Sequence, residues 1–210
     1  MTLIKSISGI RGTIGGKVGE NLTPIDAVKF GCAYGSWLKK NSDDTNISVI
    51  IGRDARISGE MIQNFVQNSL ISLGINVIDL GLSTTPTVEL MVKEYNANGG
   101  IVITASHNPA HWNALKLLDN NGEFLNSKSG EEIVKISKSD SYIFSKVFDL
   151  KEYEKNKRGY IKSLGAEKLL GTNSINDLVK TLKKSSLYVR PSLLDYLKVL
   201  MSYIKKNTQI

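Results

Sequence analysis

Apolar residues in the first hundred positions follow two periods that alternate along the chain. Helical spacing, with apolar side chains three or four positions apart, occurs at residues 22–40, 57–74 and 86–96. After each of these segments comes an apolar run of strand length, and the runs cover residues 47–52, 75–82 and 99–105. A further short run at residues 114–118 also predicts a strand. The pattern therefore predicts helices and strands in strict alternation.

Residues that favour helix ends stand at the predicted boundaries. Thr23 is a suitable N-cap and Pro24 occupies the first helical position, where its missing N–H costs nothing. Gly74 ends the second helical pattern, and Pro86 begins the third. Strands joined by helices of this length require right-handed crossovers between parallel neighbours. The sequence predicts an α/β fold, a three-layer α/β/α domain with a mainly parallel sheet.

The character of the chain changes after residue 149. Residues 1–149 form the predicted α/β domain, and residues 150–210 are expected to be a linker and a helical stub. A capping box begins a predicted helix at residues 173–184, and residues 191–206 place leucines and an isoleucine on one helical face. We expect this last amphipathic helix to need a partner surface.

Composition narrows the class of protein. The 210 residues are 41% hydrophobic and 22% charged, as in ordinary soluble domains. No apolar run has the length of a membrane span, and the N-terminus has no signal-peptide core, so we expect a cytoplasmic protein without a membrane partner. Cys32 is the single cysteine, which excludes an intrachain disulfide, and its apolar surroundings predict a buried core position.

The formal net charge of +7 is unevenly distributed. Residues 1–150 carry 14 Lys and Arg against 15 Asp and Glu, a net charge of −1. Residues 151–210 carry 13 against 5, a net charge of +8. The α/β domain has no general basic field, so a nucleic-acid partner is not expected. Any anion that it binds must be held by a few placed groups.

The polar loop TASHNP follows the third predicted strand, at the sheet edge where open α/β domains bind ligands. A serine hydrolase would need glycines where Thr104 and Asn108 stand, and a zinc site on His107 and His111 would need a helix that Pro109 forbids. Phosphoryl chemistry fits better. Ser106 would accept and donate a phosphoryl group, with Thr104, His107, Asn108, Asn113 and Lys116 as surrounding donors. A polar loop in which the serine only caps a turn stays open.

Two other segments add groups that can hold phosphate. The segment SISGIRGTIGGKVGENL is glycine-rich but matches neither a P-loop nor a dinucleotide fingerprint. Its glycines let the backbone approach a ligand, and Arg11 can grip a phosphate with two N–H groups; a plain hairpin with a surface arginine is the alternative. Arg53, Asp54 and Arg56 follow a strand, where ion pairing and ligand contact are both open.

Four segments together, SGIRGTIGG, IGRDARISGEM, GLSTTPTVEL and TASHNP with Asn113 and Lys116, resemble the α-D-phosphohexomutase superfamily. Residues 1–149 resemble its first domain. By motif position the resemblance implies that Ser106 is the phosphoserine and supplies, through its phosphate, one ligand to Mg²⁺. It further implies that Lys116 is the general acid/base and that His107 belongs to the catalytic loop. Arg11, Asn108 and Asn113 are then expected to bind substrate.

The resemblance implies a phosphohexomutase, an isomerase that interconverts hexose 1-phosphate and hexose 6-phosphate through a hexose 1,6-bisphosphate, which also acts as activator. The sugar of the substrate, glucosamine, glucose or mannose, is left open. Family enzymes take their remaining metal ligands from an Asp-rich loop in a later domain, and no D-x-D-x-D occurs here. We therefore expect a fragment, a frameshifted product or half of a split enzyme, inactive without the missing mutase domains as partners. A non-catalytic remnant or binding module with a basic tail is the alternative.

Overall fold

The computed structural model describes residues 1–6, 9–139, 141–145 and 161–163, which all belong to one unit, Met1–Ser163. Helices are α1 (Pro24–Asn41), α2 (Gly59–Ser72), α3 (Thr85–Glu94) and α4 (Ser127–Ser139). Strands are β1 (Ile4–Ser6), β2 (Gly9–Thr13), β3 (Ser48–Arg53), β4 (Asn76–Leu82), β5 (Gly99–Ile103), β6 (Trp112–Leu118) and β7 (Ile161–Ser163). The helices predicted at residues 173–184 and 191–206 lie outside the described residues, and the domain boundary after residue 149 stays a prediction.

The strands form one sheet in the order β1-β2-β6-β5-β3-β4-β7. Parallel pairing joins β5, β3, β4 and β7, and antiparallel pairing joins β1, β2, β6 and β5. The predicted α/β class is confirmed, while the sheet itself is mixed. The reason is local: β6 follows β5 after a short loop with no crossover helix, and such a connection can only join antiparallel strands.

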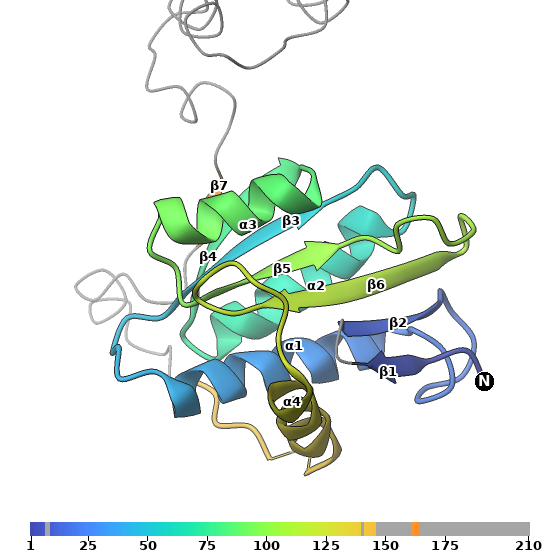
Figure 1. Cartoon of the computed structure of the whole chain (residues 1–210). Helices are drawn as coiled ribbons and strands as arrows, with labels where there is room; N and C mark the ends of the chain where they lie inside the picture. The colour runs from blue at the N-terminus through green and yellow to red at the C-terminus, as the bar shows by residue number, and fades with distance from the viewer. Residues whose placement is uncertain (7–8, 140, 146–160, 164–210) are drawn as a thin grey trace, which may run out of the picture. The chain divides into compact units, whose positions relative to one another are not determined.

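Helices cover both faces of the sheet, as the predicted three-layer architecture requires (Figure 1). A Cβ added at Gly99 would meet the Tyr34 hydroxyl of α1, and one added at Gly100 would meet Val92 of α3. Because successive strand residues point to opposite faces, α1 and α3 lie on opposite sides of β5. Helix α1 packs against α2 and α4, so three helices share one face and α3 covers the other (Figure 1).

The larger core lies between the sheet and the layer formed by helices α1, α2 and α4. It contains alternate residues of the central strands, among them Ile101 and Ile103 of β5 and Leu115 and Leu117 of β6. Cys32 of α1 is buried there, as the sequence predicts, and burial raises the pKa of its thiol. The apolar surface removed from water on this face is the main source of stability for the sheet that carries the site.

The start of α1 shows how sequence signals set a helix boundary. Thr23 is the N-cap, and its side chain accepts a hydrogen bond from the backbone N–H of Asp26. The Asp26 carboxylate in return accepts from the backbone N–H of Thr23, which completes a capping box. In the described part of the chain, no helix combines the length and the apolar character needed to cross a membrane.

Candidate active site

The candidate site lies where β3 and β5 end side by side. The two strands are parallel, and the backbone N–H of Asp54 donates to the carbonyl of Ile103 at 3.1 Å. The chain leaves β3 toward β4 and leaves β5 toward β6, on the other side. Outgoing connections that diverge in this way open a crevice at the carboxyl edge of an α/β sheet, the usual place for a ligand.

Ser106 is held in an unusual backbone conformation in this crevice. Its φ angle is 54°, in the left-handed region that residues other than glycine rarely adopt. Its backbone N–H donates to the Thr104 hydroxyl at 3.0 Å, and its side chain is exposed. Asn108 closes the turn, because both its backbone N–H and its side-chain amide donate to the carbonyl of Ala105, at 3.0 and 2.8 Å. Local strain of this kind persists only where surrounding bonds hold it, and it gathers at functional sites.

A pocket of about 210 Å³ lies beside the Ser106 loop. The lining residues are Ser6, Gly9, Arg11, Thr104, Ala105, Ser106, His107, Asn108, Ala114, Lys116 and Phe124. The lining includes two cationic side chains, Arg11 and Lys116, and no carboxylate. Across the described ranges, neither Arg11 nor Lys116 forms an ion pair with Asp or Glu. Two cations without carboxylate partners beside an exposed serine make the pocket suited to an anion such as phosphate.

Sheet register brings Arg11 and Lys116 to the same side. Arg11 of β2 pairs with Ala114 of β6, and Lys116 lies two residues further along β6. Because paired residues share a face and alternate residues point the same way, the arginine and the lysine face the pocket together. The ammonium of Lys116 lies 5.7 Å from the centre of the Phe124 ring, a cation–π contact that leaves its N–H groups available.

The structure does not bring Asn113 to the pocket. This residue points to the opposite face of β6 from Ala114, and its side chain is fully buried. Its amide donates to the Ser58 hydroxyl at 2.9 Å, and its side-chain oxygen accepts from the backbone N–H of Ala114 at 2.8 Å. The substrate-binding role that motif position implied for Asn113 has no geometric support, because both ends of the amide are used inside the domain.

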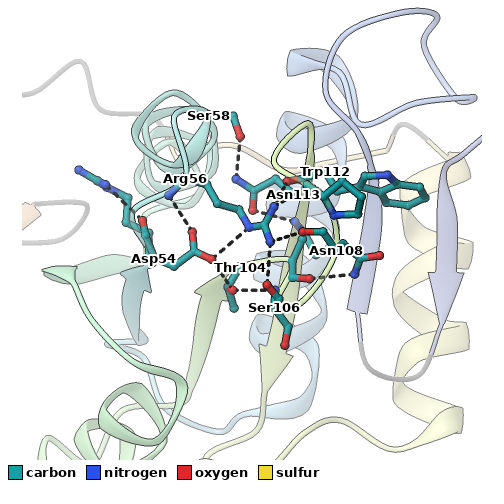
Figure 2. Close-up of polar contacts among 12 residues, drawn as sticks. Asp54, Arg56, Ser58, Thr104, Ser106, Asn108, Trp112 and Asn113 are labelled. Atoms are coloured by element: carbon teal, nitrogen blue, oxygen red, sulfur yellow. Dashed lines mark hydrogen bonds and ion pairs between the residues drawn. The ribbon is translucent and has the colours of Figure 1, made fainter.

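The other predicted residues lie at the pocket in different ways. His107 is exposed and lines the pocket with Ser106 and Asn108. Thr104 also lines it, but its hydroxyl donates to the Asp54 carboxylate, so it is a support for the loop rather than a free donor. Asp54 and Arg56 form an ion pair at 3.2 Å beside the loop, the first of the two alternatives left open by the sequence (Figure 2).

Phe124 lines the pocket without having been predicted from the sequence, and Gly9 was predicted only as one of the glycines that let the backbone approach a ligand. Phe124 follows the Asn-Gly turn after β6, and a bridge to Leu118 returns it beside Lys116. Gly9 belongs to the glycine-rich segment, and its φ of 117° together with a Cβ position 2.0 Å from the Leu115 carbonyl oxygen excludes any side chain. In the sequence, the Asn-Gly pair at residues 121–122 indicates the turn that brings Phe124 back along β6, and the glycine at position 9 indicates a close approach of the backbone.

Metal ligands are sparse in this part of the chain. Over the residues that the structure describes, no group of three or more His, Cys, Asp or Glu side chains is gathered closely enough to hold a metal ion. Asp54 lies near the loop, but both its oxygens are engaged by Arg56 and Thr104. The described residues therefore do not build a complete magnesium site.

Comparison with known proteins gives consistent matches. The family model described as phosphoglucomutase/phosphomannomutase, alpha/beta/alpha domain I, matches residues 3–143. A phosphoglucomutase/phosphomannomutase of Thermococcus kodakarensis is 44% identical over 125 residues, which cover 59% of this chain and 27% of the relative. A phosphoglucosamine mutase of Levilactobacillus brevis is 40% identical over 127 residues, 60% of this chain and 27% of the relative.

Solved structures share the fold. A phosphoglucomutase/phosphomannomutase family protein of Burkholderia thailandensis matches with a TM-score of 0.60 at 20% identity, covering 81% of this chain and 36% of that one. A protein of Thermus thermophilus that is named as a candidate phosphomannomutase matches with a TM-score of 0.58 at 24% identity. The match covers 65% of this chain and 30% of that one. The aligned region thus spans about a quarter to a third of the proteins that it matches.

Proposed function

The chain belongs to the phosphoglucomutase/phosphomannomutase family through its α/β/α domain I, and on that premise we propose that Ser106 carries the phosphoryl group of a phosphohexomutase. The observation that carries the proposal is the geometry at the end of β5. An exposed serine, strained at φ 54°, shares a pocket with Arg11 and Lys116. These are the parts that phosphoryl transfer needs: an acceptor oxygen, and cations that hold the anion and neutralise charge in the transition state.

Each residue then has a defined task. Phosphorylated Ser106 transfers its phosphoryl group to the free hydroxyl of a hexose phosphate, so the bond from phosphorus to Oγ breaks while a bond to the sugar oxygen forms. The product is a hexose 1,6-bisphosphate, which reorients and returns its other phosphoryl group to Ser106. Lys116 relays the proton: its ammonium donates to Oγ as the phosphoryl group leaves, and the resulting amine takes up the proton that the attacking sugar hydroxyl releases. The second transfer runs the same relay in reverse, with the serine hydroxyl as the attacking group. The planar guanidinium group of Arg11 donates hydrogen bonds to two oxygens of the substrate phosphate.

His107 and Asn108 have supporting tasks in the same proposal. His107 is exposed at the mouth of the pocket, where it can donate to the sugar or to its phosphate. Asn108 keeps the turn closed through its two bonds to Ala105, which holds Ser106 in place. A phosphoryl group on Ser106 would also offer one oxygen ligand to Mg²⁺. The remaining ligands, and the rest of the sugar site, are proposed to come from further mutase domains, because this chain aligns with 27% of its relative.

Phosphosite mapping tests the proposal on the chain as it is. The purified protein is incubated with glucose 1,6-bisphosphate and Mg²⁺, and its intact mass and phosphopeptides are measured. We expect one phosphoryl group, located on Ser106, and no modification of Ser106→Ala. Ser127→Ala, at the start of α4, is the matched control and should gain the phosphoryl group normally. A folded wild-type chain that stays unmodified, or a phosphate on another serine, would refute the proposed role of Ser106.

A further inference from the structure

The guanidinium group of Arg56 is surrounded by carbonyl oxygens from a single loop. Its Nη1 donates to the carbonyls of Pro109 and Trp112, at 2.8 and 2.9 Å. Its Nη2 donates to the carbonyls of Ser106 and Asn108, both at 2.7 Å (Figure 2). Each terminal nitrogen has two hydrogens and two acceptors, so all four of these hydrogens are used.

The fifth N–H of Arg56 and its backbone are fixed by Asp54. Nε donates to Oδ2 of Asp54 at 3.2 Å, and the backbone N–H of Arg56 donates to Oδ1 at 3.1 Å. The Arg56 side chain is only 12% exposed. Because every donor has a protein acceptor and little of the side chain meets solvent, Arg56 has no N–H group left to bind a phosphate. Arg11, which is exposed in the pocket, has that freedom.

The same carboxylate reaches the loop by a second route. The Thr104 hydroxyl donates to Asp54, and its oxygen accepts the backbone N–H of Ser106. Both backbone polar groups of Ser106 are therefore hydrogen-bonded. Its N–H donates to Thr104, which is bonded to Asp54, and its C=O accepts directly from Arg56. A residue other than glycine at φ 54° keeps that conformation only when its neighbours over-determine it, and these two bonds do so.

The bonds within the loop, from Asn108 to the Ala105 carbonyl and from the Trp112 N–H to the Pro109 carbonyl, close two local turns but do not join the loop to the end of β3. Pro109 has no N–H to donate, and the residues between β5 and β6 form no regular structure. Four carbonyl dipoles that converge on one point repel one another unless a cation lies at the centre. The planar fork of an arginine satisfies all four at fixed angles, which the single ammonium of a lysine cannot do.

On the basis of the proposed role of Ser106, we propose that Arg56 is the positioning residue of the phosphoryl-carrying loop. It holds the backbone of residues 106–112 so that the Ser106 hydroxyl points into the pocket, and it does not contact the phosphoryl group. Arg11 and Arg56 thus have different roles. Arg11 binds the substrate anion, and Arg56 positions Oγ of Ser106, which is the leaving atom in one transfer and the attacking atom in the other.

Hydrogen exchange tests the positioning role without any substrate. The full chain is compared as wild type, Arg56→Lys and the matched control Arg53→Lys; Arg53 contacts Glu60 at 3.5 Å but no residue of the loop. We expect the amides of Asn108 and Trp112 to exchange at least about tenfold faster in Arg56→Lys, because charge-assisted bonds that hold the loop are lost. The amides of β5 should be unchanged, which reports that the sheet is folded. Unchanged exchange in the loop would overturn the proposal.

A kinetic comparison separates positioning from phosphate binding. The rate of Ser106 phosphorylation is measured against the concentration of glucose 1,6-bisphosphate for the same variants and for Arg11→Lys. Arg56→Lys should lower the maximal rate about 100-fold, the effect of a misplaced reacting atom, and leave the half-saturating concentration within about twofold. Arg11→Lys should mainly raise that concentration. A raised half-saturating concentration with a normal maximal rate in Arg56→Lys would make Arg56 a ligand and refute its positioning role. If the wild-type chain takes no phosphate, the proposed function fails, and hydrogen exchange alone decides the role of Arg56.

Discussion

Strand β5, which delivers the Ser106 loop, depends on a contact between Gly99 and Tyr34. Tyr34 is fully buried, and its hydroxyl donates to the carbonyl of Leu118 at 2.7 Å, with a longer contact of 3.3 Å to that of Gly100. A Cβ on residue 99 would lie 2.1 Å from this hydroxyl oxygen and 2.9 Å from the Leu118 oxygen. Since carbon and oxygen cannot approach so closely, Gly99→Ala must displace the tyrosine or the strand.

The size of the effect follows from two costs. Overpacking a tight core site costs about 1–3 kcal/mol, and a buried hydroxyl and carbonyl that lose their bond cost about 1–3 kcal/mol more. Gly99→Ala should therefore lower the free energy of unfolding by about 2–6 kcal/mol. Tyr34→Phe removes only the hydroxyl and its bond, at about 0.5–1.5 kcal/mol. In the double variant Gly99→Ala, Tyr34→Phe, the hydroxyl oxygen that the new Cβ meets is gone. Its loss of unfolding free energy should therefore be smaller than the sum of the two single losses by at least about 1 kcal/mol.

Urea unfolding of the full chain, followed by circular dichroism and by tryptophan fluorescence, measures all four members of this cycle. One of the two tryptophans, Trp37, stacks on Tyr34 with ring centres 6.4 Å apart. Gly52→Ala in β3 is the matched control. Its Cβ would lie 2.6 Å from a methyl group of Val88 and meets no atom of Tyr34, so it should destabilise the domain without coupling to Tyr34→Phe. Additive losses for Gly99→Ala and Tyr34→Phe would show that the hydroxyl does not limit this site, and the reasoning would be wrong.

Three further predictions concern chemistry, capping and pH. Lys116→Met should slow Ser106 phosphorylation by glucose 1,6-bisphosphate about 100-fold or more, as expected for loss of a general acid; phosphopeptide kinetics measure it, and a wild-type rate would exclude the acid/base role. Thr23→Ala should cost about 0.5–2 kcal/mol in urea unfolding because the capping box with Asp26 is lost, whereas an unchanged midpoint would contradict that reading of the α1 boundary. Burial raises the pKa of Cys32 from its ordinary 9.0 and that of Tyr34 above its ordinary 10.0. The unfolded chain then loses these protons first, so stability should fall as pH rises above about 9, and the fall should be smaller in the double variant Cys32→Ala, Tyr34→Phe; equal slopes would disprove the linkage.

Local pattern was enough to predict much of the fold. The three helix-then-strand units, the Thr23 cap and the buried Cys32 are all confirmed, because apolar period and capping chemistry act within a few residues. Helix α4 was not predicted, although Ile133 and its apolar neighbours recur on one face among lysines and glutamates. The antiparallel half of the sheet was also missed, since strand direction depends on which distant segments pair.

Within the site, the sequence by itself determined the chemistry that is available, and the tertiary structure decided which groups meet. The exposed Ser106 loop and two cations, Arg11 and Lys116, follow from motif and composition, and the structure gathers them in one pocket. Strand β6 begins at Trp112, so the two-residue alternation turns Asn113 into the core and Lys116 toward the pocket. Arg56 could be seen from the sequence only as a charge after a strand. Its part in holding the loop arises because β3 and β5 are neighbours, a long-range pairing that no local pattern specifies.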